Sequence, residues 1–378
     1  MNDNSKKPVL VCVVGARPNF MKIAPIMAAI KKQEGHLQPY LVHTGQHYDE
    51  AMKDSFFRQL GIPEPDIDLE VGSGSHAVQT AEIMRLFEPV LDDLNPFAVL
   101  VVGDVNSTIA CGLVAVKKHI PLIHVEAGLR SGDRQMPEEI NRVLTDQISD
   151  LLFTTEKEAE KNLVAEGIDS KRVCFAGNVM IDTLLNNLKK ATPFSEVLSR
   201  HISSYRQNIE AKNYALLTMH RPSNVDDEAV LSRILDTIVE ISQKLPVIFP
   251  VHPRTAKMIE KFGLTSKLQS GNITCLPPLP YLEILGVVSS AKVVLTDSGG
   301  LQEETTALGV PCITLRESTE RPITVDQGTN VIVGSDSEKI LSSMKEVLER
   351  GGKSGQIPEK WDGHAAKRII QKIIEHYL

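Results

Sequence analysis

Cysteine and aromatic side chains are scarce in this sequence of 378 residues. Phe, Trp and Tyr together make up 4% of it, so a buried core has to be built from aliphatic side chains. The five cysteines lie far apart, within or beside apolar stretches, and form neither a CxxC pair nor a Cys/His metal-ligand spacing. We therefore expect buried free thiols in a reducing cytosol rather than a disulfide framework or a zinc site.

Excess positive charge and long apolar runs are missing as well. The formal net charge is -7, which argues against a nucleic-acid partner because phosphate backbones are held by an excess of Lys and Arg. No apolar run approaches the roughly 20 residues that span a bilayer, and the opening MNDNSKKP carries no apolar signal segment. We expect a cytoplasmic protein with no membrane and no nucleic-acid partner, which holds any anionic ligand through local basic residues.

Several familiar catalytic signatures are also absent. The sequence contains no HExxH, no Walker loop and no GxSxG elbow, and the segment after the first predicted strand is GARPNFMKIAP rather than GxGxxG. The last of these absences removes the fingerprint of a nicotinamide dinucleotide site. We predict neither a metal nor an organic cofactor.

What the sequence does contain is a regular alternation of two kinds of segment. Short β-branched runs, such as VLVCVVG ending at Gly15 and AVLVVGD ending at Asp104, are each followed by a stretch with helical periodicity, such as residues 77–91 and 107–118. Near-continuous apolar strands that alternate with amphipathic helices are typical of parallel sheets covered on both faces. The pattern predicts the α/β class.

The alternation pauses between about Asn178 and Asn213 and then resumes with YALLTMH, PVIFPVH and KVVLTDSGG. We predict an N-terminal domain over residues 1–180 and a C-terminal domain over 181–361, each a doubly wound Rossmann-like domain, facing each other across a cleft. Residues 362–378 place several isoleucines on one face of a helix. We expect that helix to join the first domain.

Ligands of open parallel sheets bind beyond the carboxyl ends of the strands, so the residues there are the candidates for function. In TDSGGLQEE, Ser298, Gly299 and Gly300 stand where a strand gives way to a helix. The unpaired N–H groups and partial positive charge of a helix N-terminus, with glycines that let a phosphate approach, suit a diphosphate. Glu303 or Glu304 could accept hydrogen bonds from ribose hydroxyls. A plain N-cap followed by a turn would give the same pattern.

Basic side chains stand at other predicted strand ends. Arg17 and Lys22 follow the first strand, His220 and Arg221 follow the first strand of the second series, and Arg321 lies in TERP. An arginine can fork onto a phosphate, whereas a lysine acts as a point charge. A lone cation is more often a solvated surface residue, but the position of these residues at strand ends favours an anion site.

Carboxylates occupy similar positions in the first half of the chain. Asp104 ends one strand, Glu126 ends the next in HVEAGLR, and MPEEINR carries Glu138, Glu139 and Arg142 at the start of a helix. Each acid taken singly could be an N-cap or a surface charge. Acids at neighbouring strand ends together favour acid and base catalysis.

These motifs, taken in order, resemble those of the non-hydrolysing UDP-N-acetylglucosamine 2-epimerases. The segments that carry the resemblance are GARPNFMKIAP, TGQHYD, VVGDVNST, HVEAGLR, MPEEINR, LTMHRPSN, PVHPR, TDSGGLQEE and TERPITVDQGTN. They cover about residues 8–375, and HVEAGLR with PEE and DSGG with QEE are specific in combination. The resemblance implies a GT-B architecture, a homodimer, interconversion of UDP-GlcNAc and UDP-ManNAc, and a role in bacterial surface polysaccharide synthesis.

The same resemblance implies roles for individual residues. It gives as UDP contacts Arg17, His220, Ser298, Gly299, Gly300, Glu304 and Arg321, beside which Arg221 is a further candidate for substrate binding. It gives as catalytic surroundings of the sugar Lys22, Asp104, Glu126, Glu138, Arg142 and again His220.

The chemistry of such a reaction fits these residue types. The hydrogen on carbon 2 of an N-acetylhexosamine is not adjacent to a carbonyl, so its removal needs an activating step. Without a nicotinamide, UDP can leave carbon 1 as the proton leaves carbon 2, and UDP can then add back to the 2-acetamidoglucal with protonation from the opposite face. Four alternatives stay open: a UDP-2,3-diacetamido-glucuronate 2-epimerase, a hydrolysing relative, a GT-B glycosyltransferase and a non-catalytic UDP-sugar sensor.

Overall fold

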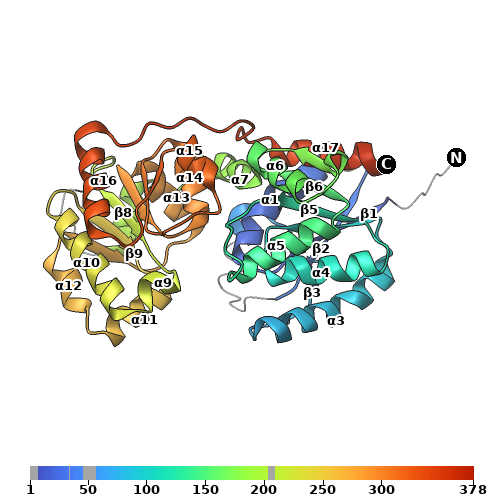
Figure 1. Ribbon diagram of the computed structural model, residues 1–378, viewed down its shortest axis with the longest axis horizontal. Helices are drawn as coiled ribbons and strands as arrows, with labels where there is room; N and C mark the ends of the chain where they lie inside the picture. Colours follow the sequence, from blue (N-terminus) through green and yellow to red (C-terminus); the bar gives the residue numbers. More distant parts are fainter. Residues whose placement is uncertain (1–6, 34, 46–56, 203–208) are drawn as a thin grey trace. The chain divides into compact units, whose positions relative to one another are not determined.

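The computed structural model describes residues 7–33, 35–45, 57–202 and 209–378. The chain forms two compact units, shown in Figure 1. The first unit comprises Met1–Asn186 together with Glu359–Leu378, and the second comprises Asn187–Pro358. Each unit contains a parallel sheet with helices packed on it.

The sheet of the first unit has the strand order β3-β2-β1-β4-β5-β6-β7, and each neighbouring pair is parallel. This is the doubly wound order, in which the chain reverses direction beside the first strand. Its strands are β1 (Val9–Val14), β2 (Gln38–His43), β3 (Ile67–Asp68), β4 (Ala98–Val102), β5 (Leu122–Ala127), β6 (Leu151–Thr154) and β7 (Val173–Phe175).

Helices cover both faces of this sheet. On one face α3 and α4 lie side by side (Figure 1), where they pack on β-strand residues such as Val11 and Val99. Side chains alternate along a strand, so the neighbouring residues point to the opposite face, where α1 lies against β1, β2 and β4. The helices are α1 (Arg17–Lys31), α3 (His76–Leu94), α4 (Asn106–Lys117), α5 (Pro137–Ile148), α6 (Lys157–Ala165), α7 (Val179–Leu188) and α17 (Ala365–Tyr377), with a short 3-10 turn η1 (Ser170–Arg172).

The second unit repeats the arrangement with the strand order β10-β9-β8-β11-β12-β13, again parallel throughout. Its strands are β8 (Ala215–Thr218), β9 (Val247–Pro250), β10 (Ile273–Leu276), β11 (Val293–Thr296), β12 (Cys312–Thr314) and β13 (Asn330–Ile332). Its helices are α8 (Phe194–His201), α9 (Pro222–Val225), α10 (Glu228–Ser242), α11 (Pro253–Lys261), α12 (Thr265–Ser270), α13 (Tyr281–Ser290), α14 (Gly299–Leu308), α15 (Pro322–Asp326) and α16 (Ser337–Arg350).

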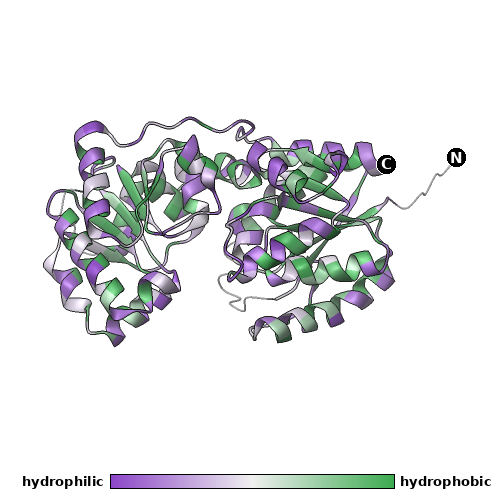
Figure 2. Ribbon diagram, viewed as in Figure 1, coloured by the Kyte–Doolittle hydropathy of each residue, from purple (hydrophilic) through white to green (hydrophobic). Residues whose placement is uncertain are grey.

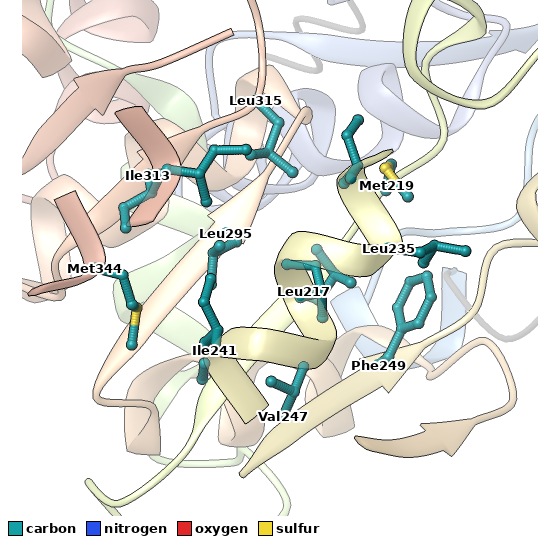
Figure 3. Packing of buried hydrophobic residues seen from close by; sticks show 14 of the residues in the cluster. Leu217, Met219, Leu235, Ile241, Val247, Phe249, Leu295, Ile313, Leu315 and Met344 are labelled. Atoms are coloured by element: carbon teal, nitrogen blue, oxygen red, sulfur yellow. The ribbon is translucent and has the colours of Figure 1, made fainter. Parts of the chain in front are cut away.

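Aliphatic side chains form the interior of both units. Figure 2 shows the strands of each sheet as the most apolar part of its unit. In the second unit Leu217, Leu295 and Ile313 project from adjacent strands onto Leu235 and Ile241 of α10, as Figure 3 shows. Strands buried on both faces need apolar residues at successive positions, which is why they read as continuous apolar runs. The predicted α/β class is confirmed.

The unit boundaries differ from the predicted ones, which lay at 180/181 and 361/362. The first unit runs to Asn186 and takes the chain back at Glu359. In α7 the Thr183 hydroxyl donates to the Met21 carbonyl of α1 at 2.5 Å. At the return, the Trp361 indole donates to the Thr155 carbonyl at 3.1 Å. Thr183 lies within the pause in the strand pattern, and Trp361 lies one residue before the predicted start of the terminal segment. The pause locates a linker but not the packing of its ends.

Helix α17 packs on α1 through the apolar face that its sequence predicts, with Ile369, Ile370 and Ile373 buried. Its first turn is held by Asp182 of α7, whose carboxylate accepts the Ala365 and Ala366 amides at 3.1 and 2.7 Å. A carboxylate at a helix N-terminus satisfies amides that have no intrahelical partner.

Within the described ranges, no helix combines the length and the apolar character needed to cross a membrane.

Asp182 makes the stability of the first unit depend on pH. Burial raises its pKa from an ordinary 3.8 to about 6, against the two amide hydrogen bonds. The folded state therefore holds this proton more tightly than the unfolded chain. The resulting stabilisation is complete below pH 3.8 and is lost as the pH rises through about 6.

The variant Asp182→Asn removes this titration. Relative to the natural protein, its free energy of unfolding should rise by roughly 3 kcal/mol between about pH 4 and about pH 7, because the pKa shift no longer opposes folding. Urea unfolding followed by the fluorescence of Trp361, the one tryptophan in the sequence, measures the first unit. Asp93→Asn, at an exposed position of α3, is the control. A difference that stays flat across this range would contradict the assignment.

Candidate active site

The carboxyl ends of β1, β4 and β5 lie next to one another in the first sheet. Lys22 follows β1 in the second turn of α1, Asp104 follows β4, and Glu126 stands near the end of β5. The strand order therefore brings to neighbouring strand ends three residues that are far apart in the sequence.

Lys22 and Glu126 form a buried ion pair with a distance of 2.7 Å between Nζ and Oε1. Gly103 makes room for it, because a Cβ atom there would lie 2.7 Å from the lysine Nζ. Glu126 itself has a φ of 72° in the left-handed region, which is costly for a residue with a Cβ. The surrounding structure therefore holds Glu126 in a strained conformation beside a cation.

Asp104 is held by Arg142 of α5, whose guanidinium lies 2.5 Å from the carboxylate oxygen. The same guanidinium donates to Glu139. Burial pushes the pKa of Glu139 upward, but hydrogen bonds from the Ser131 amide and Arg142 outweigh it, and the pKa is lowered. Glu139 is thus a structural anion that orients Arg142 toward Asp104. Glu138, the predicted acid, is half-buried in the first turn of α5.

In the second unit, a buried carboxylate organises the loop after β8. Asp297 accepts the His220 and Arg221 amides and the Asn224 side-chain amide, and it contacts the His220 Nδ1 at 2.9 Å. Burial pushes the pKa of Asp297 upward, but the His220 hydrogen bond and charge outweigh it, so the pKa is lowered. With Nδ1 held in this way, the Nε2 of His220 is the ring atom available to a ligand, and the side chain is 37% exposed.

Helix α14 begins in the TDSGGLQEE segment, with Ser298 as its N-cap residue and Gly299 as its first residue. A Cβ atom on Gly299 would lie 2.8 Å from a carboxylate oxygen of Glu320, so glycine is needed for this approach. An anion already stands at this helix N-terminus in the form of the Glu320 carboxylate. One turn further on, Glu304 is buried and accepts a hydrogen bond from the Tyr281 hydroxyl at 3.3 Å.

Three arginines gather around the carboxylates of Glu320 and Glu303. Arg316 lies 2.9 Å and Arg221 lies 3.9 Å from Glu320, while Arg321 pairs with Glu303 at 2.9 Å. Burial pushes the pKa of Glu320 upward, but the charges of Arg321 and Arg316 outweigh it and lower the pKa to about 2. The second unit therefore collects the cationic groups and the helix N-terminus that an anionic ligand requires.

Some predicted residues fall outside this description. Helix α1 begins at Arg17, but the side chain of Arg17 lies outside the described part of the structure, as do residues 46–49 of TGQHYD. Sequence reasoning missed Asp297 as an anchor, Arg316, and the buried pair His124 and Asp146. Asp297 directly follows β11 and His124 lies within β5, and both stand inside motifs that the sequence had singled out, which was the available signal. Among the described residues, no group of three or more His, Cys, Asp or Glu side chains could hold a metal ion.

Comparisons with known proteins agree with this arrangement. The sequence profile of the UDP-N-acetylglucosamine 2-epimerase family matches residues 28–374. The chain belongs to the UDP-N-acetylglucosamine 2-epimerase family. The predicted resemblance is thereby confirmed, and with it the class of enzyme, because members of this family are epimerases.

Relatives of known sequence and structure support the same conclusion. A UDP-N-acetylglucosamine 2-epimerase from Methanococcus maripaludis is 43% identical over 340 residues, covering 89% of this chain and 91% of its own length. A UDP-2,3-diacetamido-2,3-dideoxy-D-glucuronate 2-epimerase from Pseudomonas aeruginosa is 40% identical over 342 residues, covering 90% of this chain and 92% of its own.

The crystal structure of a Methanocaldococcus jannaschii UDP-GlcNAc 2-epimerase in complex with UDP-GlcNAc and UDP aligns with 97% of this chain and 99% of its own, at 41% identity and a TM-score of 0.87. The fold of this chain is therefore that of the family, which has the predicted GT-B architecture.

The role of Asp297 as an anchor can be tested with the variant Asp297→Asn. An amide nitrogen at this position would face other N–H donors, so the loop after β8 should lose about 1–3 kcal/mol of local stability. Hydrogen exchange measured by mass spectrometry on peptides covering residues 215–225 should show faster exchange. Asp326→Asn, at an exposed position of α15, is the control and should leave those peptides unchanged. Equal protection in both variants would remove Asp297 from this role.

Proposed function

We propose that this protein interconverts UDP-GlcNAc and UDP-ManNAc by eliminating UDP to give a 2-acetamidoglucal and then adding UDP back. The observation that carries the proposal is the division of chemistry between the units. The first unit places Asp104 and Glu126 at adjacent strand ends, each beside a cation. The second unit gathers arginines and a glycine-lined helix N-terminus. Family membership supports the same reaction.

The reaction needs one set of groups that moves protons at carbon 2 and another that stabilises the departing diphosphate. Two acids are required on opposite faces of the sugar ring, because the proton leaves from one face and returns from the other. The leaving UDP needs preorganised positive charge, which costs no reorganisation when the bond breaks. These two requirements match the residues of the first and the second unit.

We assign the roles accordingly. Groups for proton transfer and for orienting the sugar are Asp104, Glu126, Glu138, Lys22, Arg142 and His220. Groups for holding UDP are Arg17, Arg221, Ser298, Gly299, Gly300, Glu304 and Arg321. In this assignment Lys22 and Arg142 orient their partner carboxylates, and the Nε2 of His220 faces the ligand.

The test uses UDP-GlcNAc in deuterated water without nicotinamide or acceptor, followed by NMR at carbon 2. Elimination and re-addition should place deuterium on carbon 2 of UDP-ManNAc, because the returning proton comes from solvent. Free ManNAc would indicate hydrolysis instead, and unchanged substrate would contradict the proposal. A parallel incubation with UDP-2,3-diacetamido-2,3-dideoxy-D-glucuronate tests the substrate of the Pseudomonas aeruginosa relative; faster turnover of that sugar would replace the substrate proposed here.

The variant Asp104→Asn tests whether Asp104 takes part in proton transfer rather than in the binding of UDP. It should reduce kcat by a factor of about 10² to 10⁴, the usual contribution of an acid or base, while calorimetry shows little change in UDP affinity. Full activity in this variant would remove Asp104 from the catalytic set.

We further propose that the enzyme is cytoplasmic and forms a homodimer through the helices on one face of the first sheet. Ile140 and Leu144 lie one turn apart on α5 and are 44% and 48% exposed. The side chain of Asn106 contacts both His76 of α3 and Asn141 of α5, so the starts of these helices lie together. Exposed large apolar side chains on one helix face are typical of association surfaces.

Sedimentation equilibrium tests this surface. The double variant Ile140→Asp, Leu144→Asp should fall from about twice 41.6 kDa to a monomer of that mass, because charges replace the buried apolar contact. Ile357→Asp is the matched control, since Ile357 is 60% exposed in the second unit. A mass that is unchanged in the double variant would exclude this face as the interface.

A further inference from the structure

Behind the acids of the first unit lies a pair of buried side chains that takes no direct part in the proposed reaction. His124 lies on β5, two residues before Glu126, and Asp146 lies on α5. Their side chains are fully buried. The Nδ1 of His124 lies 2.7 Å from a carboxylate oxygen of Asp146, and its Nε2 lies 2.8 Å from the Gly103 carbonyl oxygen.

Both ring nitrogens of His124 therefore face an acceptor. A carbonyl oxygen can only accept, so Nε2 must carry a hydrogen. The contact at Nδ1 also needs a hydrogen, and a neutral imidazole has only one N–H. The pair thus holds one proton more than a neutral histidine beside a carboxylate would.

The surroundings of Asp146 place that proton on the histidine. The second oxygen of Asp146 accepts the Gly128 amide at 3.0 Å and lies 2.8 Å from Arg130. Both contacts favour the ionised carboxylate, so His124 is an imidazolium. Arg130 also pairs with Glu166, so the four charged side chains alternate in sign and compensate one another.

The backbone groups that this pair holds are next to the candidate acids. The Gly103 carbonyl immediately precedes Asp104, and the Gly128 amide follows Glu126 by two residues. Between them, the pairing of β5 with β6 shifts register between Val125 and Ala127, which places Glu126 at an irregularity of the strand. Its left-handed conformation persists only if the neighbouring backbone is held.

We propose that His124 and Asp146 form an ion-paired clamp that sets the position of Asp104 relative to Glu126. The clamp joins the end of β4 to the end of β5 and to α5 through side-chain hydrogen bonds. It touches no substrate and acts through the two acids, so both members are positioning residues. The catalytic part of this inference rests on the proposed function, whereas the charge state of His124 does not.

The charge state can be tested directly on the natural protein labelled with ¹⁵N-histidine. Both ring nitrogens of His124 should show a directly bonded proton between about pH 6 and about pH 8, and the spectrum of His124→Gln assigns the signals. The charged groups that face the ring from neighbouring elements are Asp146 and, through it, Arg130. A ring nitrogen without a proton would overturn the clamp, whether or not the enzyme epimerises UDP-GlcNAc.

The positioning role can be tested with His124→Gln, Asp146→Asn and the double variant. Each single variant should lower kcat by about 10²-fold, since a misplacement of about 1 Å has that effect. The affinity for UDP should change less than about threefold, because the groups proposed to hold UDP lie mainly in the second unit. The double variant should resemble either single one, as expected for residues that act as a unit.

Two outcomes would overturn the positioning role. One is a kcat within about threefold of the natural protein in a folded single variant. The other is a parallel loss of kcat, UDP affinity and thermal stability, which a general structural defect would cause. If His124→Gln does not fold, His124→Asn, which can still reach Asp146, provides the same comparison. A natural protein without epimerase activity would contradict the proposed function and leave the NMR result standing.

Discussion

Charge that is buried at the ends of parallel strands needs a partner of opposite sign, and this constraint organises both units. An ionised carboxylate away from water is tolerated only when it is paired and hydrogen-bonded. Glu126 has Lys22, Asp104 has Arg142, and Asp297 has the amides and ring of the loop that begins at His220. The same pairs that permit burial also hold each side chain in one orientation. Stability and preorganisation therefore come from the same contacts.

The two units apply this constraint to different sets of side chains. In the first, cations stand beside acids and orient them, and a glycine at position 103 lets Lys22 approach the backbone. In the second, carboxylates hold arginines near the start of α14, where Gly299 makes the close approach of an anion possible. The Glu320 carboxylate stands close to Gly299 at that helix end and pairs with Arg316.

Much of the fold follows from patterns that are local in the sequence. Apolar runs of strand length, alternation with amphipathic helices and the isoleucine face of residues 369–373 each report a local requirement for burial. The candidate residues were also found locally, because strand ends are visible as the points where an apolar run stops. The contacts between these residues could not be found in this way. Glu139 rather than Glu138 is the buried acid that bonds Arg142, and two adjacent glutamates cannot be told apart until the helix is rotated against the sheet.

The sequence by itself determined the α/β class, the existence of two sheets, the family and the residues at the strand ends, because each depends on short-range periodicity or on motifs in order. Only the tertiary structure decided that His124 and Asp146 form a buried pair, that Arg321 faces Glu303, and that α7 and Trp361 belong to the first unit. These contacts join residues that are distant along the chain. Which of many possible partners a buried charge finds depends on strand order and helix rotation, and no local pattern records either.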